Sequence, residues 1–481
     1  MSTAVVVGSG PNGLAAAIRL AQHGIRVHVL ETGEVIGGGT RSCERTIPGL
    51  LHDDCSAFHP TGAGSPFLQS LGLEAYGLQW RWPEIDVAHP LDSGSAGVLW
   101  RDIDRTALAM EEDGEAWLRV FGELAGSFDG LVEDVFRPTL RRPVHLAGFC
   151  GFAVRALPPV SWTVRKWKRP ETRGLFAGIA AHAFTSLRAP LSSSAGLVLT
   201  AAGHAYGWPV AEGGSRSVTD AMAALLRGLG GTIETGTRVR SIEELGRPDV
   251  VMLAVTPRAA IGITGGRLPG RVARAYRRYR FGPGAYKVDF AVAGEVPWSN
   301  EFCRRAGTVH LGGTFEEIAA AESAAVQGVM PDRPFVLVGQ QYLADPSRSV
   351  GDINPVWAYA HVPHGYRGDA TTAVIGQIER FAPGFRARIV GQHVRSVPQM
   401  EQYNPNYVGG DIGAGANTWR QLVLRPRLAL DPYATGIPGV YLCSSATPPG
   451  GGVHGMCGYN AAESALRYLE RTGPCRAEAR R

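Results

Sequence analysis

The hydrophobic pattern at the start of the chain predicts a βαβ unit. Residues 4–7 are a short β-branched run, which is typical of a buried parallel strand. Residues 14–22 place small and apolar side chains at the spacing of a helix packed on a sheet, and residues 27–30 form a second apolar run. A glycine-rich turn joins the first strand to the helix. This order of strand, turn, helix and strand is typical of nucleotide-binding α/β domains.

The turn has the glycine spacing of a dinucleotide-binding motif. Gly8 permits the tight turn, Gly10 lets the backbone approach a pyrophosphate, and Gly13 lets the helix lie close to the strand. The free N–H groups and the dipole at the helix N-terminus favour the negative charge of phosphates. Glu31 ends the second strand and is placed to accept hydrogen bonds from ribose hydroxyls, and an acid at this position disfavours NADP.

Two later segments carry patterns that fit the same sheet. In the first, a Gly-Gly turn precedes a helix predicted over 218–229, and short strands follow over 232–234 and 238–242. A buried strand is predicted over 250–255. In the second segment, residues 439–468, a strand, a glycine-proline loop and a helix follow one another.

The rest of the chain has a different character. Residues 61–206 have mostly helical patterns with many Trp and Arg, whereas residues 265–430 alternate apolar and polar positions as strands do. We therefore predict an α/β fold in which a discontinuous Rossmann-like domain is interrupted twice by an interleaved α+β substrate domain. The predicted ranges are 1–60, 207–264 and 431–471 for the nucleotide domain, 61–206 and 265–430 for the substrate domain, and 472–481 for a frayed tail.

Composition narrows the class of protein. The chain has 481 residues, 44% of them hydrophobic, which is typical of a globular protein with room for two domains. No apolar run reaches the length of about 18 residues that a membrane span needs. A strand that already begins near residue 4 leaves no room for a cleaved signal peptide, so we expect a cytoplasmic protein.

Cysteine usage, histidine spacing and charge exclude several kinds of site. The seven cysteines form no CxxC pair and the 13 histidines show no metal-ligand spacing, so we expect reduced thiols and no metal. The net charge of +5 is mild, and the arginines lack the interleaved aromatic motifs of nucleic-acid-binding modules. We therefore expect no nucleic-acid partner. No pattern predicts an oligomeric state.

Two basic stretches leave peripheral membrane contact open. Residues 162–173 contain Trp162 and Trp167, which could lie at a headgroup boundary. In residues 271–282, one helical face carries Arg271, Arg274 and Arg278. Ordinary solvated helix faces have the same composition, so both interpretations stay open.

Several motifs occur in the order seen in one known family. They are the turn at 8–13 with Glu31, GEVIGGGTRS at 33–42, HDDCSAFHP at 52–60, GWPVAEGGS at 207–215 and SSATPPGGGVHGM at 444–456. Residues 447–455 resemble the carotenoid-desaturase motif THPGAGIPG, with Pro448 in place of its His and His454 in place of its second Pro. Over nearly its full length the chain resembles the phytoene-desaturase-like FAD-dependent oxidoreductases, distant relatives of the monoamine oxidases and carotenoid desaturases. It looks most similar to the branch of pyridine nucleotide-disulphide oxidoreductase domain-containing proteins.

The resemblance implies an FAD-binding domain of the glutathione-reductase or amine-oxidase type. It assigns the ADP half of FAD to the first turn and Glu31, the pyrophosphate and flavin to residues 38–41, and the adenine to the backbone of Val239. The loop at 451–454 would lie under the isoalloxazine ring. The implied cofactor-binding residues are Gly8, Gly10, Pro11, Asn12, Gly13, Glu31, Gly38, Gly39, Thr40, Arg41, Val239, Ser445, Gly451, Gly452, Val453 and His454.

The motifs that are missing favour non-covalent FAD as the only cofactor. A disulfide reductase needs a second GxGxxG unit and a cysteine pair, and neither is present. Monoamine oxidases attach flavin through a cysteine, whereas the matching stretch at 422–436 contains none. The electron donor is then a small-molecule substrate, and the acceptor is oxygen, a quinone or another carrier.

Two residues are candidates for catalysis. Lys287 resembles the lysine that holds a water at the flavin N5 of amine oxidases, and a solvated strand lysine is the alternative. His454 is the titratable group of the C-terminal glycine loop, and a histidine that braces the loop is the alternative. His52 and His59 are weaker candidates.

Three functions fit these residues. The first is a dehydrogenase, desaturase or oxidase that transfers hydride from a C–H bond of a hydrophobic or conjugated molecule to flavin N5. The second is a flavin amine oxidase, which Met456 at the position of the aromatic cage disfavours. The third is a non-catalytic binding protein with a flavin fold. Intact glycines in both motifs favour an enzyme.

Overall fold

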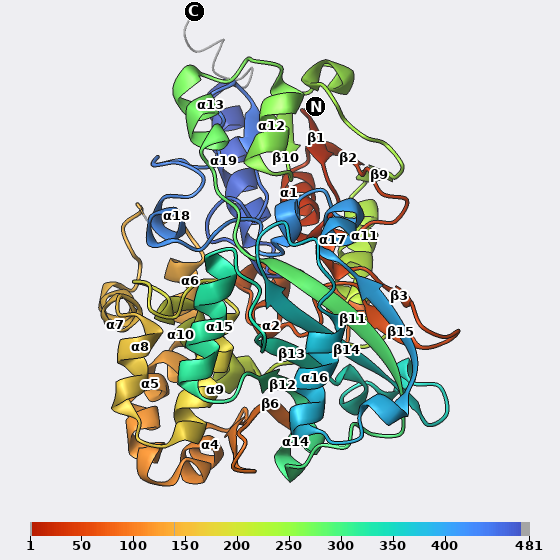
Figure 1. Cartoon of the computed structure of the whole chain (residues 1–481). Coiled ribbons are helices and arrows are strands. Elements are labelled where there is room, and N and C mark those ends of the chain that lie inside the picture. The colour runs from red at the N-terminus through yellow and green to blue at the C-terminus, as the bar shows by residue number, and fades with distance from the viewer. Residues whose placement is uncertain (1, 139, 473–481) are drawn as a thin grey trace, which may run out of the picture.

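The computed structural model describes residues 2–138 and 140–472, and its first sheet contains the N-terminal strand (Figure 1). This sheet has five parallel strands in the order β16-β10-β1-β2-β9. Its strands are β1 (Thr3–Val7), β2 (Arg26–Leu30), β9 (Thr232–Glu234), β10 (Val250–Leu253) and β16 (Val440–Leu442). The central strand is therefore the first in the chain. One of its neighbours, β2, follows it directly, whereas the other, β10, comes from a segment more than 200 residues later.

Helices cover both faces of the first sheet. Val6 of β1 belongs to the core formed with α1 (Pro11–Gln22), α11 (Arg216–Gly228) and α19 (Met456–Thr472). Val7 points to the opposite face and belongs to the core formed with α12 (Pro257–Thr264) and α13 (Gly270–Arg277). Because both faces are buried, the strands are nearly continuous apolar runs, which explains why their pattern was readable in the sequence.

The structure agrees with the predicted βαβ unit and with the later strands and helices of this sheet, apart from one segment. The strand predicted over 238–242 is wrong. After β9 the backbone donates from Gly236 to Gly33 and from Thr237 to Glu31, which turns the chain across the carboxyl ends of the strands. A 3₁₀ turn at Ile242–Leu245 follows. The segment is thus a crossing over the sheet edge and not a sixth strand.

The second sheet has seven strands in the order β15-β11-β14-β13-β12-β6-β7. Only the β12–β6 pair is parallel, and the other pairs are antiparallel. The strands are β6 (Ile85–Pro90), β7 (Ala96–Leu99), β11 (Gly284–Ala293), β12 (Ala306–Leu311), β13 (Val336–Gly339), β14 (Ile353–Val362) and β15 (Ile389–Arg395). Two short pairs complete the strands: β3 (Ser42–Glu44) with β4 (Leu51–Asp53), and β5 (Trp80–Arg81) with β8 (Val210–Ala211).

The helical prediction for residues 61–206 is wrong over residues 80–99, where β5, β6 and β7 lie. All six side chains of β6 are buried, and they include Asp86 and His89. These two buried polar residues interrupt the apolar run, so the strand left no recognisable signal.

Helices flank the second sheet on both sides. α9 (Pro170–Ala181) and α15 (Phe315–Val326) pack on one face, and α16 (Thr371–Phe381) packs on the other. The helices of residues 103–206 gather on one side of the molecule (Figure 1). The remaining helices are α2 (Pro60–Ala63), α3 (Pro66–Gln69), α4 (Ile103–Ala109), α5 (Gly114–Gly126), α6 (Phe128–Val135), α7 (Leu146–Ala156), α8 (Val160–Thr163), α10 (Ser193–Tyr206), α14 (Glu301–Arg305), α17 (Val397–Tyr403) and α18 (Trp419–Leu424).

The strands divide between the sheets as the predicted domains do. Those of the first sheet fall in the ranges predicted for the nucleotide domain, and those of the second in the ranges predicted for the substrate domain. The domain boundaries themselves stay a prediction. Thr472, the first residue of the predicted tail, ends α19, and the rest of that tail lies outside the described residues. Among residues 2–138 and 140–472, none of the helices is long and apolar enough to cross a bilayer.

Candidate functional site

A cavity of about 1360 Å³ begins over the carboxyl ends of β1, β2 and β10 and continues to the second sheet. One end is formed by backbone turns. The other end is formed by side chains of α7, α10 and α18 and of the second sheet. All the cofactor-binding residues predicted from the sequence line this one cavity. The structure therefore brings together residues from opposite ends of the chain, although their roles stay predictions.

The first turn is closed by its glycines. Gly8 has a φ of +103°, which L side chains rarely adopt. A Cβ on Gly13 would overlap the carbonyl oxygen of Gly8, so a side chain here would push α1 off the turn. A Cβ on Gly38 would lie 3.0 Å from the Cα of Gly10, which brings the second glycine turn directly against the first. This narrow backbone cradle is suited to a pyrophosphate.

Glu31 is buried at the edge of the cradle. Its carboxylate accepts hydrogen bonds from Ser9 N (2.8 Å), Ser9 Oγ (2.7 Å) and Gly33 N (2.8 Å). Arg41 adds an ion pair at 3.2 Å and also donates to the carbonyl of Val35. The carboxylate is thus fixed in place at the end of β2, where the sequence predicts contact with ribose.

The C-terminal glycine loop meets the first turn from the opposite side. Asn12 Nδ2 donates to Ser445 Oγ at 3.1 Å, and a Cβ on Gly458 would overlap the carbonyl oxygen of Asn12. The N-terminus of α19 therefore packs against that of α1. Asn12 Oδ1 is buried and has no hydrogen-bond partner within the part of the chain that the structure describes. An unpaired buried acceptor at this point fits a polar ligand such as a dinucleotide.

His454 both braces the C-terminal loop and lines the cavity. Its Nδ1 accepts from Met456 N at 3.0 Å, and its ring centre lies 4.8 Å from that of Phe136. Burial lowers the pKa of His454 to about 4, so the ring is neutral near pH 7. The bracing alternative therefore has direct support in the geometry, and the catalytic role stays a prediction.

Lys287 lies behind the cavity wall. It is 1% exposed, so the alternative of a solvated strand lysine is wrong. Its ammonium forms an ion pair with Asp289 and lies 5.9 Å from the ring centre of Trp357. Trp357 and Tyr359, its neighbours on β14, line the cavity, whereas Lys287 does not. This position gives the catalytic prediction for Lys287 no support.

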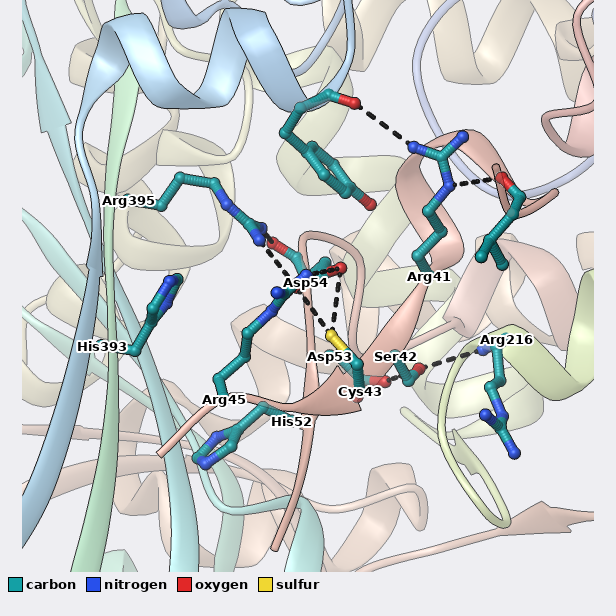
Figure 2. Close-up of polar contacts among 12 residues, drawn as sticks. Arg41, Ser42, Cys43, Arg45, His52, Asp53, Asp54, Arg216, His393 and Arg395 are labelled. Carbon is teal, nitrogen blue, oxygen red and sulfur yellow. Dashed lines mark hydrogen bonds and ion pairs between the residues drawn. The ribbon is translucent and has the colours of Figure 1, made fainter. Parts of the chain in front are cut away.

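A charged layer joins the β3–β4 hairpin to β11 and β15 (Figure 2). Asp54 accepts two hydrogen bonds from Arg45 (2.9 and 2.8 Å) and one from Arg395 (2.9 Å). Burial alone raises the pKa of Asp54, but the two guanidinium groups outweigh it and lower the pKa. Burial and Asp54 raise the pKa of the Cys43 thiol to about 12, which leaves it protonated and unreactive.

The neighbouring carboxylate, Asp53, ties the same hairpin to other parts of the fold. It accepts hydrogen bonds from Ser42 Oγ (2.6 Å), Ser215 N (2.7 Å) and Arg348 Nη1 (2.5 Å), and Arg348 is fully buried. The sequence analysis used this stretch only as part of a family resemblance. The two consecutive acids, separated from the apolar pair Leu50 and Leu51 by one histidine, were the visible sign of this buried charged layer in the sequence.

The two weaker histidine candidates lie in different places. His52 is buried beside Asp289, at 3.5 Å, and does not line the cavity. His59 does line it, and its Nε2 lies 2.9 Å from Ser215 Oγ. Burial lowers the pKa of both histidines to about 4. Among the described residues, neither histidine side chain forms a hydrogen bond to the two glycine turns.

Two tyrosines that the sequence analysis missed cover the second glycine turn. Tyr403 Oη donates to the carbonyl of Gly38 at 2.7 Å, and a Cβ on Gly39 would overlap the hydroxyl of Tyr407. Both come from the α17 region, nearly 370 residues after the turn. Because nothing local in the sequence connects these segments, only the spacing Tyr-x₃-Tyr was visible.

The far end of the cavity is apolar. It is lined by residues that include Phe149, Phe152, Ala156, Phe184, Val198, Leu199, Trp208, Leu337, Trp357, Tyr359 and Leu422. These residues come from many separate segments, and two of them, Phe184 and Trp208, lie in no helix or strand. No group of His, Cys, Asp and Glu side chains in the described ranges is arranged to hold a metal ion.

Comparisons with known proteins agree with this geometry. A family model described as an NAD(P)-binding Rossmann-like domain matches residues 6–71. Pyridine nucleotide-disulfide oxidoreductase domain-containing protein 2 of Mus musculus is 24% identical over 561 aligned residues, 97% of this chain and 94% of the mouse protein. Hydroxysqualene dehydroxylase of Rhodopseudomonas palustris is 40% identical over 75 residues, 15% of this chain and 18% of that protein. The Rossmann-like domain and the similarity to pyridine nucleotide-disulfide oxidoreductase domain-containing proteins, both predicted from the sequence, are therefore confirmed.

The fold is also found among solved structures. Wild-type putrescine oxidase bound to putrescine matches with a TM-score of 0.62 and 17% identity over 98% of this chain and 99% of that chain. At this identity the likeness concerns the fold. It confirms the predicted fold class, an α/β protein of the amine-oxidase type with a second, interleaved domain.

Proposed function

We propose that this protein is an FAD-dependent oxidoreductase that takes hydride from a C–H bond of a hydrophobic or conjugated small molecule. The observation that carries the proposal is the continuity of one cavity, which joins two glycine turns to an apolar far end. FAD, when bound, supplies the acceptor for the hydride. The apolar far end would take up a molecule with little polar surface.

The residues of the turns would bind and orient the cofactor. The cradle of Gly10 and Gly38 would take the pyrophosphate, and the fixed carboxylate of Glu31 would accept from ribose hydroxyls. The N-terminus of α19, which has no acid in its first turn, would present the positive end of its dipole to a negative charge at the ring. A neutral His454 adds no cation beside that loop, and the apolar wall excludes water.

Non-covalent attachment is part of the proposal. Cys443 and Cys457 are buried near the C-terminal loop, and burial raises the pKa of both, to about 11 for Cys457. Thiols in this state are poor nucleophiles. Denaturing the protein in acid should therefore release all of the flavin into the supernatant.

The main experiment is an anaerobic titration of the purified protein with polyenes, amines and cyclic metabolites. A polyene or another apolar molecule should bleach the visible flavin absorbance, and oxygen or a quinone should restore it. A preparation without flavin absorbance that also takes up no added FAD would refute the proposal.

An amine oxidase is the second candidate. The likeness of the fold to putrescine oxidase favours it, whereas Met456 at the position of the aromatic cage disfavours it. Bleaching by amines alone, with hydrogen peroxide formed in air, would select this candidate. A protein that binds FAD but is bleached by none of these molecules would instead fit the non-catalytic alternative.

The catalytic prediction for Lys287 is tested by Lys287→Met. A lysine acting at the flavin would make reduction or reoxidation at least about tenfold slower in this variant. Rapid-reaction rates equal to those of the wild type would assign Lys287 to the ion pair with Asp289 alone.

We also propose peripheral contact with an anionic membrane, at a surface that shares Trp162 and Lys166 with one of the two predicted stretches and nothing with the other. Trp167 is buried, and α13, which carries Arg271 and Arg274, lies well apart from α7 in Figure 1. Large exposed apolar side chains are concentrated in residues 140–162 and 419–430: Leu140, Val144, Leu146, Val154, Leu157, Trp162, Trp419, Val423, Leu428 and Leu430.

This apolar patch continues into the cavity, because Leu157 and Val423 are both exposed and part of the cavity wall. Exposed Arg141 and Arg142 lie in the first of these segments and exposed Lys166 lies four residues after it, and these cations favour anionic lipid. The protein should float with anionic vesicles, and Trp162→Ser with Leu157→Ser should abolish flotation, whereas Arg271→Ser should not. Flotation that depends on Arg271, or no flotation at all, would contradict this surface.

A further inference from the structure

Two buried histidines stand side by side on the second sheet, next to the cavity. His89 on β6 and His310 on β12 follow the parallel pair Ala88 and Val309, and both are 0% exposed. A Cβ at Gly178 of α9 would lie 2.9 Å from His310 Nδ1 and 3.1 Å from His89 Nδ1. The absence of a side chain at Gly178 thus makes room for both rings, whose Nδ1 atoms are buried and have no hydrogen-bond partner within the described residues.

The helix that covers these rings ends at a third histidine. His182 directly follows α9, and its Nε2 lies 3.1 Å from His310 Nε2. Its ring packs edge-on against Trp208, with centres 5.4 Å apart, and His182 lines the cavity. Within the described part of the chain, Nδ1 of His182 has no hydrogen-bond partner. His310 Nδ1 is an unpaired nitrogen that is fully shielded from solvent, whereas His182 Nδ1 is not fully shielded. This nitrogen is therefore the end of the chain of histidines that the cavity can reach.

Burial keeps the three histidine rings neutral, and one hydrogen bond establishes which nitrogen of His89 carries the proton. Burial lowers the pKa of His89 to about 4 and that of His182 to about 3, and burial with neighbouring histidines lowers the pKa of His310 well below its usual value. All three rings are thus neutral near pH 7. His89 Nε2 lies 2.7 Å from the carbonyl oxygen of Gly313 and must donate, so His89 Nδ1 carries a lone pair.

His89 Nδ1 and His310 Nδ1 have no hydrogen-bond partner within the described residues, so the bond between His182 Nε2 and His310 Nε2 is compatible with either direction of donation. In the tautomer in which His182 Nε2 donates to His310 Nε2, His182 Nδ1 carries a lone pair toward the cavity. The buried carboxylate of Glu322 is occupied by His361 Nδ1 at 2.7 Å.

We propose that His182 Nδ1 is the acceptor that binds the hydroxyl group of an otherwise apolar alcohol in this cavity. The wall residues beside it, Ala183, Phe184 and Trp208, are uncharged, which suits a neutral hydroxyl better than an ammonium ion. As a statement about the substrate, this inference rests on the oxidoreductase function proposed above. As a statement about binding, it needs no turnover. His310 acts as a positioning residue, since it reaches the ligand only through its hydrogen bond with His182.

The test compares two probes whose shared oxygen carries either a hydrogen or a methyl group. Farnesol carries a hydroxyl donor, and farnesyl methyl ether has the same chain and oxygen without the donor. Binding of each is measured by tryptophan fluorescence and calorimetry with the full-length protein as purified. We expect farnesol to bind about tenfold more tightly than the ether, the size of one good hydrogen bond in an apolar site.

Variants separate the acceptor from a merely structural histidine. His182→Phe should bring the two probes to within about twofold of each other by weakening farnesol alone, because only the acceptor is lost. His182→Asn, which keeps an acceptor, should restore part of the preference, and His145→Phe at an exposed site should change nothing. Nitrogen-15 NMR should show Nδ1 of His182 without a proton at pH 7, and Gly178→Ala should alter that signal.

Each contrary result has a defined meaning. A protonated His182 Nδ1, an unchanged preference in His182→Phe, or no binding of either probe would overturn the inference. Binding of farnesol through His182 by a protein that takes up no FAD would refute the proposed function and leave this inference standing. Flavin bleaching by apolar molecules with no preference for farnesol would do the reverse.

Discussion

The two ends of the cavity differ in whether backbone or side chains form their walls. The nucleotide end is made of backbone, since Gly8, Gly13 and Gly38 hold it open and side chains are excluded from it. The far end is made of side chains from separate helices and strands, backed by buried charged and histidine layers. At the nucleotide end, a few glycine positions accept almost no substitution. At the far end, the packing energy is shared among many side chains, so the shape of the cavity can vary without loss of the fold.

The most severe way to break the nucleotide end is Gly13→Ala. Its Cβ would overlap the carbonyl oxygen of Gly8, so α1 must move away from the turn, and we expect no folded protein that retains flavin. Thermal unfolding and visible absorbance measure this. Gly122→Ala on α5 is the matched control, because a Cβ there has nothing within 4 Å, and it should stabilise the protein by up to about 1 kcal/mol. Normal flavin content in Gly13→Ala would contradict the backbone account.

The far end is tested next by Lys287→Met. Removal of the lysine leaves Asp289 buried without its ion-pair partner, and the free energy of unfolding should fall by about 3–5 kcal/mol. Urea denaturation measures the change. The double variant Lys287→Met with Asp289→Leu should regain most of this loss, because no charge is then stranded. A double variant as unstable as the single one would show that packing and not charge is decisive here.

Lowering the pH should reduce the free energy of unfolding gradually, through His454 in the C-terminal loop. The pKa of His454 is about 4 in the folded protein and near 6.5 when unfolded, so the unfolded state binds the proton first. Stability is therefore complete above pH 6.5 and is lost as the pH falls toward 4. At pH 5 the His454 contribution to this loss is about 2 kcal/mol.

His454→Asn isolates this contribution, since Asn keeps an acceptor for Met456 N but does not titrate. Its free energy of unfolding should fall less steeply than that of the wild type between pH 6.5 and pH 5. His145→Asn, at an exposed site, is the control and should follow the wild-type curve. Parallel curves for His454→Asn and the wild type would mean that His454 is already protonated when folded.

The smallest expected effect is that of Glu31→Gln. The amide loses the charge that accepts from Ser9 and pairs with Arg41, and the affinity for FAD should fall about tenfold. Titration of the flavin-free protein with FAD measures this. Glu34→Gln, three residues on and exposed, should bind FAD as the wild type does. Equal losses in both variants would remove the special role of Glu31.

The contrast between the two ends also explains what the sequence could predict. The βαβ unit, α11, β16 and α19 were predictable because each is a local pattern and each glycine has a local reason. The strand β6 was not, because its buried Asp86 and His89 disguise it. The segment 238–242 failed because hydrogen bonds to distant residues decide its path.

The candidate site divides in the same way. The predicted cofactor-binding residues all reached one cavity, since they lie in turns that follow strands of the same sheet. Tyr403 and His182 were missed because their partners, Gly38 and His310, are more than 100 residues away. For Lys287 the sequence left a position at the flavin and a solvated position open, and it could not show that the side chain is buried with Asp289 beside its ammonium.

The packing of α19 on α1 sets the order in which the protein can mature. Gly458 closes on Asn12, and β16 reaches the sheet only at residue 440, so the cradle begun by the first thirteen residues lacks its opposite wall until translation is nearly finished. A ribosome-bound nascent chain thus exposes an incomplete pocket. A variant truncated before α19 would therefore lack one wall of the cradle.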